Sequence, residues 1–199
     1  DLVSANLSDP KITQTASRVT AFRPHGAKIV LYTVPSLSNK DMVDVMIHDG
    51  DKDYLLRQLP KSTKYLLDLA EFDGAWYVAV GSSENKKVYV YVDPFNDLKR
   101  ENQRLPQPTV LLRLNSPVDH LTFSGNTRFI AIQAGSEFAV FDAETSRQYR
   151  YDIKLNYPKG YKAKWMDGHR LTAISENKLV VFDFDGTNKQ TLVSANPNF

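Results

Sequence analysis

The stretch KLVVFDFDGT, residues 178–187, decides which fold the sequence predicts. An apolar run ends at Asp183, and Gly186 follows shortly after it. Valine and phenylalanine favour strands, whereas aspartate and glycine accept the backbone angles of tight turns. The stretch therefore predicts a β-strand that leads into a hairpin turn, with a further strand at residues 190–193.

The same pattern occurs four times along the chain. Apolar strands that lead to an aspartate lie at residues 43–49, 88–93, 138–142 and 179–183. Two earlier strands precede each of them, at residues 19–34, 66–80, 118–132 and 161–174. A fourth strand follows each aspartate, at residues 54–59, 110–114, 149–153 and 190–193. The segment 64–71 has some helical propensity, but its place in the repeat predicts a strand.

Four short antiparallel strands in about 40–50 residues, repeated along a chain, are typical of a β-propeller blade. We therefore expect an all-β protein, a β-propeller of about four blades of four antiparallel strands. The blades are predicted at approximately 12–60, 63–115, 116–156 and 160–195, as one domain over 1–199. A sandwich or barrel also has many short strands, but it would not be expected to repeat one pattern four times.

A repeated pentapeptide bears on whether the blades close into a ring. The sequence LVSAN occurs at residues 2–6 and again at 192–196. Because the second copy is the predicted outer strand of the last blade, residues 1–7 are predicted to be the outer strand of a preceding or closing blade. The chain starts without methionine, so we expect it to be processed or part of a longer protein. An arc of a larger propeller is favoured over a closed ring, and its open strand edges invite pairing with another chain.

The last repeat resembles the WD40-like blades of the TolB type. It contains WMDGHRL at 165–171 and KLVVFDFDGTN at 178–188, which supply an aromatic, a glycine turn, an apolar strand and a D-x-D-G-x-N-like turn. The earlier repeats depart from this pattern at Asp93-Pro94 and Asp142-Ala143. The resemblance implies a propeller fold and a bacterial extracytoplasmic or cell-surface protein.

Charge and composition exclude several classes of site. The 25 Lys and Arg residues nearly balance 23 Asp and Glu, for a net charge of +2. Neither nucleic acid nor an anionic membrane is therefore an expected partner, since both need clustered positive charge. The absence of cysteine excludes disulfides, cysteine zinc ligands and a cysteine nucleophile. No stretch approaches the ~20 apolar residues of a membrane helix, so direct membrane insertion of this segment is not expected.

One motif suggests an enzyme. The sequence VVFDFDGT at 180–187 is similar to the first motif of haloacid-dehalogenase-like phosphatases, which implies Asp183 as nucleophile, Asp185 as acid/base and Mg²⁺ as cofactor. That family needs a lysine and further acidic residues downstream, yet residues 188–199 contain no carboxylate side chain. The preferred interpretation is a hairpin turn, in which both aspartates accept backbone N–H bonds and Gly186 has positive φ.

Other catalytic or metal-binding patterns are missing. The histidines are His25, His48, His120 and His169, and no two of them have the local spacing of metal ligands. There is no G-x-S-x-G, Walker loop or G-x-G-x-x-G. The acidic segment 49–53 is predicted to be a solvated turn rather than a weak Ca²⁺ site. No catalytic, cofactor-binding or metal-binding residue is therefore predicted, and the protein is not expected to be an enzyme.

The long polar insertion at residues 94–108 is the candidate binding loop, because long loops are often functional. Phe95 and Leu98 are possible exposed anchors, and Lys99, Arg100 and Arg104 form a basic cluster. A short helical turn is possible between residues 97 and 104. A solvated loop without a partner remains the alternative.

The leading hypothesis for function is a non-catalytic propeller that binds another protein as a scaffold. One alternative is a propeller that gates or supports a peptidase-like enzyme domain elsewhere in a longer chain. Another is a carbohydrate-binding propeller. Its aromatic signal is a set of tyrosines near lysines, namely Tyr149, Tyr151, Tyr157 and Tyr161, although core and rim packing is the preferred interpretation of them.

Overall fold

The computed structural model describes residues 1–5, 12–50, 52–100, 105–157 and 160–194, and these residues are almost entirely β-structure. Sixteen strands form four antiparallel sheets of four, which we call blades 1 to 4. Blade 1 contains β3 (Ala21–His25), β4 (Ile29–Pro35), β5 (Met42–Asp49) and β6 (Lys52–Pro60). Blade 2 contains β7 (Tyr65–Phe72), β8 (Ala75–Ser82), β9 (Lys87–Val92) and β10 (Val110–Arg113).

Blades 3 and 4 repeat this order of strands. Blade 3 contains β11 (His120–Phe123), β12 (Phe129–Ala134), β13 (Glu137–Asp142) and β14 (Arg147–Asp152). Blade 4 contains β15 (Lys164–Trp165), β16 (Arg170–Ser175), β17 (Lys178–Asp183) and β18 (Gln190–Ser194). Each strand pairs with its neighbour in sequence, so each blade is a meander. The all-β, four-bladed propeller architecture predicted from the repeat is confirmed.

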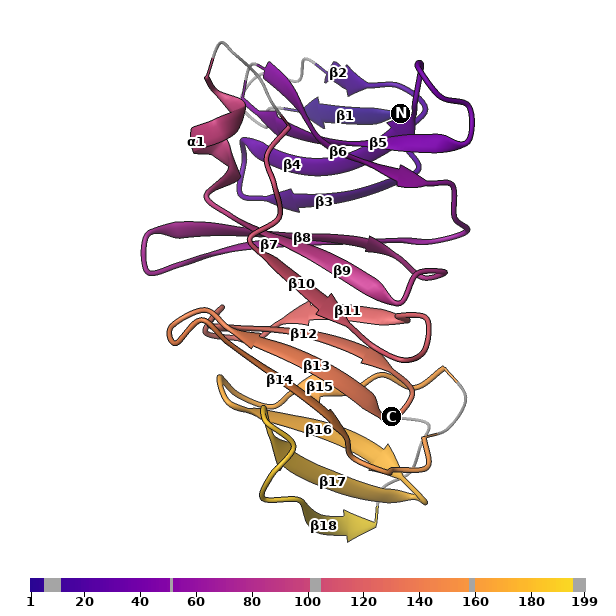
Figure 1. Ribbon diagram of the computed structural model, residues 1–199, viewed down its shortest axis with the longest axis vertical. Coiled ribbons are helices and arrows are strands. Elements are labelled where there is room, and N and C mark those ends of the chain that lie inside the picture. The colour runs from indigo at the N-terminus through magenta and orange to yellow at the C-terminus, as the bar shows by residue number, and fades with distance from the viewer. Residues whose placement is uncertain (6–11, 51, 101–104, 158–159, 195–199) are drawn as a thin grey trace.

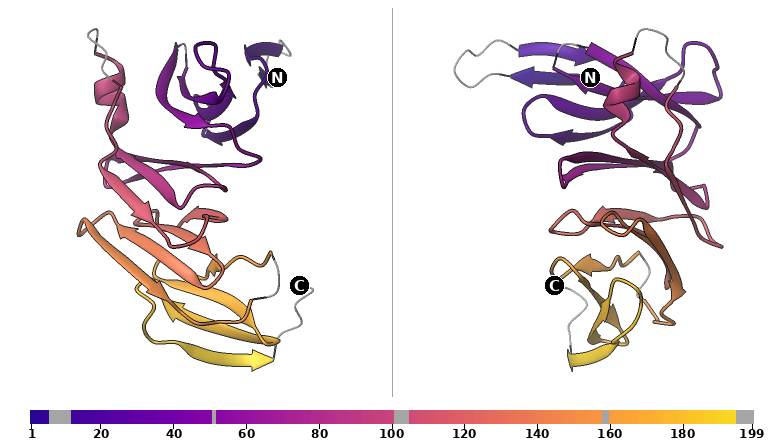
Figure 2. Two further views of the ribbon diagram at one scale, coloured as in Figure 1. Left: turned by 45° about the vertical axis from the view of Figure 1, so that its right-hand side comes forward. Right: turned by 60° about the vertical axis from the view of Figure 1, so that its left-hand side comes forward.

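The blades stack side by side along an open arc, with blade 1 and blade 4 at opposite ends (Figures 1 and 2). The first strands of neighbouring blades contact each other, β3 with β7 and β7 with β11, and so form the inner edge of the arc. The fourth strands, β6, β10, β14 and β18, are the outer edges of their sheets. Pairing with another chain at such an edge stays a prediction.

The core lies between the blades. Strand β12 is buried at all six positions, because blades 2 and 4 cover its two faces. The outer strand β14 has no fully buried residue. This contrast explains why β12 is an apolar run whereas β14 is polar, as expected when packing rather than strand propensity selects the side chains. The fourth strand of blade 2, β10, is mostly apolar, because Val110 and Leu112 belong to the core.

The N-terminal segment is arranged differently from the blades. Strand β1 (Leu2–Ala5) pairs with β2 (Ile12–Ala16) as a two-stranded antiparallel sheet. Blade 1 already has four strands from Ala21 onward, so residues 12–16, which were assigned to it from the sequence, pair outside it. The second copy of the LVSAN repeat extends beyond the described residues.

Two local predictions concern helix and strand. Residues 64–71 were expected to be a strand despite their helical propensity, and β7 confirms this. The expected helical turn lies slightly earlier in the chain, as the short helix α1 (Pro94–Leu98), whose first residue is a proline. Proline suits the first turn of a helix because it lacks the N–H that would be unpaired there. None of the helical segments among the described residues has the length and apolar character needed to cross a membrane.

Candidate functional site

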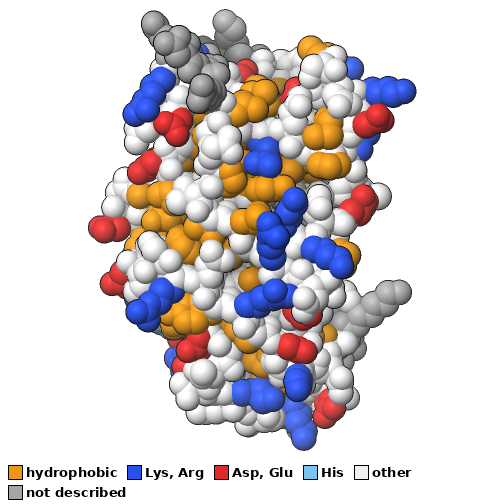
Figure 3. Space-filling view, in the orientation of Figure 1, with side chains coloured by type: hydrophobic (Ala, Val, Ile, Leu, Met, Phe, Trp, Pro, Cys, Tyr) orange, Lys and Arg blue, Asp and Glu red, His pale blue; other side chains and the backbone are white. Residues whose placement is uncertain are grey.

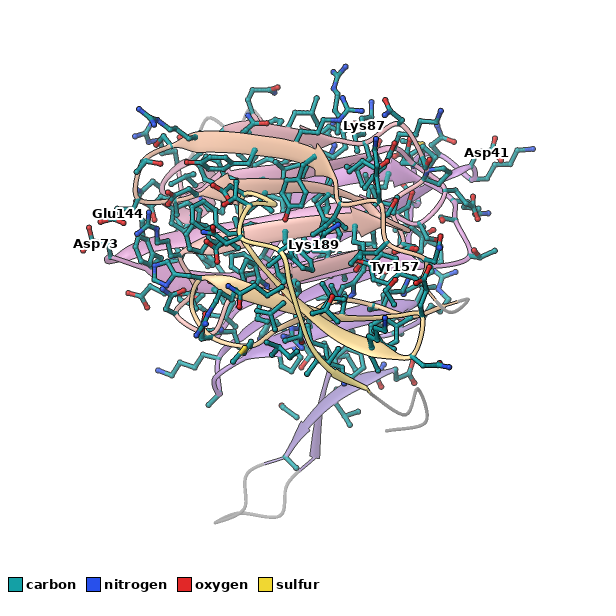
Figure 4. The ribbon with its side chains drawn as sticks, turned by 90° about the horizontal axis from the view of Figure 1, so that it is seen from below. Asp41, Asp73, Lys87, Glu144, Tyr157 and Lys189 are labelled. Carbon is teal, nitrogen blue, oxygen red and sulfur yellow. The ribbon has the colours of Figure 1, made fainter. Side chains whose placement is uncertain are left out.

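The strands of every blade run between two ends of the molecule, and the two ends differ. We call one the aspartate end, because the third strands finish there at Asp49, Asp93, Asp142 and Asp183. The other is the connection end, where the turns between second and third strands meet the connections to the next blade. In Figure 4, Asp73 and Glu144 lie on the aspartate side, whereas Asp41, Lys87 and Tyr157 lie toward the opposite side.

Carboxylates at the aspartate end are used within the fold. Asp142 is 1% exposed and accepts hydrogen bonds from Arg128 Nε and Nη2 at 2.8 and 2.7 Å, from Thr145 Oγ1, and from the Glu144 N–H. Burial alone would raise the pKa of Asp142, but these hydrogen bonds together hold it below its usual range. Asp93 accepts the Trp76 N–H at 2.7 Å. These aspartates therefore stabilise turns and strand ends.

The phosphatase-like motif lies in such a turn, between β17 and β18. Asp185 accepts hydrogen bonds from the Thr187 N–H at 3.0 Å and its hydroxyl at 2.6 Å, and Gly186 has φ +84°. Asp183 accepts a hydrogen bond from the side-chain amide of Asn188, rather than from a backbone N–H. The geometry is that of the hairpin turn preferred from the sequence, and both carboxylates bind groups of the turn itself.

Four hollows lie at the connection end. The hollow on blade 2 has a volume of about 510 Å³ and is lined by Glu84, Asn85, Lys86, Lys87, Arg113 and Leu114. The hollow near the start of blade 1 measures about 430 Å³, and those on blades 3 and 4 about 260 and 230 Å³. Each combines a second-to-third-strand turn or its flanking strand with a segment at a blade connection. The connection end therefore offers concave surface on all four blades within the part of the chain that the structure describes.

Glutamates at the connection end hold the loops that enter blades 2, 3 and 4. In each of these blades a glutamate at or just before the third strand accepts hydrogen bonds from the residues that precede the blade's first strand. The pairs are Glu84 with Thr63, Glu137 with Asn115 and Ser116, and Glu176 with Asn156, at 2.8 to 3.3 Å. The hydrogen bonds from Thr63 lower the pKa of Glu84. The sequence analysis did not predict this recurrence, although a glutamate in or beside the second turn of the last three repeats was a visible signal.

Three cations at the connection end have no carboxylate partner within the described part of the chain. Lys86 and Arg113 are exposed and Lys87 is half-buried, and no ion pair joins any of them to a carboxylate among the described residues. Figure 3 shows lysine and arginine side chains gathered over β10 and the neighbouring turns. Because three cations line the hollow on blade 2 against the single carboxylate of Glu84, the hollow is electropositive.

A histidine on the inner edge lies in the same positive surroundings. Burial is the main cause that lowers the pKa of His120, and the positive charges of Lys162 and Lys64 lower it further. The Asp119 carboxylate acts in the opposite direction, but it is paired with Lys162 at 2.7 Å. A protonated imidazole is therefore disfavoured at this position.

The helix α1 of the candidate binding loop packs against β6 of blade 1 and β8 of blade 2. Leu98 is 4% exposed in the core shared by blades 1 and 2, and Phe95 packs edge-on against Trp76 at 5.6 Å. The expectation of exposed anchors is wrong for Leu98, because α1 turns its apolar side toward β6 and β8. Lys99 pairs with Asp49 at 2.5 Å, and Arg100 lies 3.5 Å from Asp97. Arg104 lies outside the described residues, and a binding role for the loop stays a prediction.

The histidines do not assemble a metal site in the part of the chain that the structure describes, where no group of three potential ligands occurs. His48 contacts Asp53 at 3.0 Å, while His25 and His169 pack edge-on against Trp76 and Phe129.

The tyrosines of the possible sugar platform pack against other aromatic rings. Tyr151 stacks on Phe138 at 5.4 Å, Tyr157 stacks on Tyr161 at 6.1 Å, and Tyr149 packs against Phe184 at 5.1 Å. All four tyrosines border the core between blades 3 and 4. Core and rim packing, the preferred interpretation of these residues, is what the structure shows.

Comparison with known proteins supports the fold but assigns neither a family nor a function. No family model matches the chain, and no curated protein sequence matches it significantly. Solved structures do resemble it. The dihydro-heme d1 dehydrogenase NirN has a TM-score of 0.53 at 13% identity and shares 96% of this chain and 42% of its own.

Two yeast structures give a similar result. The fission yeast SREBP-SCAP binding domains have a TM-score of 0.51 at 14% identity, over 92% of this chain and 50% of theirs. Hsv2 of Kluyveromyces lactis has a TM-score of 0.50 at 13% identity, over 88% and 52%. The chain thus spans about half the length of the structures that it resembles, and at these identities the likeness shows a WD40-like propeller fold alone.

Proposed function

We propose that this chain is a non-catalytic propeller module that binds another protein, and that the connection end is its binding face. The observation that carries the proposal is the cationic hollow at the connection end. At the aspartate end, Arg128 and Arg170 pair with carboxylates and Asp185 is bonded within its turn, whereas the exposed Lys28 and Arg147 do not line any of the hollows described above. At the connection end, hollows coincide with Lys86, Lys87 and Arg113, which have no carboxylate partner among the described residues.

Further support comes from the rigidity of the blades and the engagement of their acidic groups. The blades hold the connection loops at fixed positions, because each loop is anchored through a glutamate. The only motif with a catalytic precedent is engaged in its own turn. One structure with this fold is a complex of binding domains, whereas another is a dehydrogenase, so fold alone does not separate the two classes.

The place in the cell belongs to the same proposal. The resemblance of the last repeat to TolB-type blades supports a bacterial extracytoplasmic or cell-surface location. Fractionation of the encoding cells with an antibody against this chain tests it, and recovery only with cytoplasmic markers would contradict it.

Site-directed photo-cross-linking in the encoding cells tests the binding face. A photoreactive amino acid is placed at Ser116, exposed at the connection end, and in a separate protein at Ala27, exposed in a turn of the aspartate end. We expect a discrete cross-linked protein from position 116 that is absent from position 27. Identical products from both positions, or none from position 116, would overturn the proposal.

A further inference from the structure

The hollow on blade 2 is the largest of the four hollows at the connection end, at about 510 Å³. The turn between β8 and β9 forms one side of it, and the end of β10 forms the other. Its volume is in the range of pockets that hold a ligand of several residues or a small molecule. Five of its six lining residues are polar or charged, and their aliphatic parts supply apolar surface between the charges, so its occupant should combine charged with apolar groups.

An unfavourable pair of charges lies in this lining. Lys87, the first residue of β9, is the direct ladder partner of Arg113, the last residue of β10. Like charges directly opposite each other in an antiparallel pair destabilise a sheet. The equivalent pair in blade 3 is Glu137 with Asp152, but hydrogen bonds from Asn115, Ser116, Ser136 and Lys154 N–H groups and side chains satisfy those carboxylates. In the blade 2 pair, Lys87 contacts the Tyr89 side chain, but no ion pair joins Lys87 or Arg113 to a carboxylate among the described residues.

Neighbouring groups increase the positive charge around this pair. Lys86 lies in the adjoining turn, and Arg57 from blade 1 lies over the Tyr89 ring at 3.5 Å, with Lys87 near the same ring at 5.4 Å. The single carboxylate of the lining, Glu84, accepts two hydrogen bonds from Thr63. A ligand that brings carboxylates would relieve the repulsion between Lys87 and Arg113.

We propose that the hollow on blade 2 binds an acidic peptide segment, and that Lys86, Lys87 and Arg113 contact its carboxylates. This inference rests on the proposed protein-binding function and names the chemistry of the partner. An acidic peptide fits better than a nucleic acid, because Lys86, Lys87 and Arg113 form one compact cluster at a single hollow, whereas a phosphate backbone needs cations along an extended path. Charge complementarity of this kind gives specificity and a fast association rate.

Fluorescence anisotropy with the whole chain tests the proposal. The probe is a labelled short peptide in which glutamate alternates with valine and threonine, and its matched control has glutamine in place of glutamate. We expect the acidic peptide to bind and the glutamine peptide not to bind. Binding should weaken as salt is raised, because exposed charges are screened.

Two double variants with the same change of net charge locate the site. Lys86→Glu with Arg113→Glu should weaken binding about tenfold or more, as expected when complementary charges become repulsive. Lys28→Glu with Arg147→Glu, at exposed positions of the aspartate end, should change affinity by less than about twofold, since screening limits the range of surface charge. If the glutamate double variant does not fold, Lys86→Gln with Arg113→Gln should still reduce affinity.

The outcomes separate this inference from the proposed function. Equal loss of peptide binding in both double variants, or tighter binding of a single-stranded oligonucleotide than of the acidic peptide, overturns the acidic-peptide site. If position 116 still cross-links a partner in cells, the protein-binding function stands without it. Conversely, if the peptide binds at the hollow but position 116 gives no cross-link in cells, the acidic-peptide site is supported and the proposed protein-binding function is rejected.

Discussion

Strand β13 carries a carboxylate at each end, and the two have different roles. Asp142 lies at the aspartate end, is almost fully buried, and receives hydrogen bonds from Arg128 and two residues of its turn. Glu137 lies at the connection end, is half-buried, and holds the loop that enters blade 3. The first belongs to the packed framework, whereas the second positions a loop at the surface that we propose for binding.

The comparison extends to whole ends of the molecule. At the aspartate end, Arg128 and Arg170 are ion-paired with nearby carboxylates, so these two cations are already neutralised within the fold. At the connection end the glutamates are directed to backbone and side-chain donors, which leaves neighbouring cations free of them. Similar residue types thus produce a structural end and an electropositive end, because different donors lie beside the carboxylates.

Removal of the two β13 carboxylates should have effects of different size. Asp142→Ala leaves Arg128 without its buried partner, and we expect the free energy of unfolding to fall by about 3 kcal/mol. Glu137→Ala frees N–H groups that water can reach, so we expect a loss of about 1 kcal/mol. Urea denaturation followed by tryptophan fluorescence measures both. Glu144→Ala, at a mostly exposed partner of Arg128, is the control and should change stability by less than about 0.5 kcal/mol. Equal losses for Asp142 and Glu137 would contradict the contrast between the two ends.

Glycine turns at the aspartate end should differ according to what packs against them. Gly74 and Gly186 both have positive φ, but a Cβ at Gly74 would meet nothing within 4 Å, whereas one at Gly186 would lie 2.6 Å from the Tyr151 ring. We expect Gly74→Ala to lower the free energy of unfolding by about 1 kcal/mol from backbone strain alone. Gly186→Ala should cost about 2 kcal/mol because overpacking adds to the strain.

A variant of Tyr151 tests whether overpacking against its ring causes the extra loss of stability. In a Tyr151→Ala background the contact is removed, so the extra cost of Gly186→Ala should disappear in a double-mutant cycle. An unchanged cost in that background would show that the Tyr151 ring is not its cause.

Acid should weaken the connection end before the aspartate end. The folded-state pKa of His120 lies below its ordinary value of 6.5, so the folded state binds fewer protons than the unfolded state in that window. Stability contributed by His120 is therefore present above about pH 6.5 and is lost as pH falls through the folded pKa. Asp142 follows the same rule at lower pH, because its folded pKa lies below 3.8.

Chemical denaturation at a series of pH values measures this effect, which should be the smallest of the three because it involves a single partly solvated ring. His120→Gln should flatten the dependence that begins below about pH 6.5 while leaving the fall that carboxylates cause at lower pH. A wild-type slope that persists in the variant would assign the titration to another group.

Local, periodic features were predictable from the sequence. The strands before Asp93, Asp142 and Asp183 begin with a charged residue and are then apolar up to the aspartate, because inner strands are covered on both faces. The following turns use residues that tolerate positive φ. The turn geometry at Gly186 could be derived for the same reason. Periodicity depends only on neighbours in sequence, so it can be recognised without knowledge of the fold.

The prediction that was wrong and the contacts that were not predicted depend on residues that are distant in sequence. Leu98 belongs to a polar loop in sequence, yet its side chain is buried in a core shared by blades 1 and 2. The glutamate anchors join residues that are about twenty positions apart, which no local pattern relates. The opposition of Lys87 and Arg113 arises only because the long insertion brings β10 back beside β9.

The sequence by itself determined that four similar β-meanders follow one another, because strand and turn preferences are written into each repeat. Only the tertiary structure decided what the charges do. Whether a carboxylate neutralises a cation, caps a loop or stays exposed depends on which donor the packing of blades places beside it. The DFDGT stretch is the clearest case, since its residues suggested a phosphatase and its place in blade 4 makes it a turn.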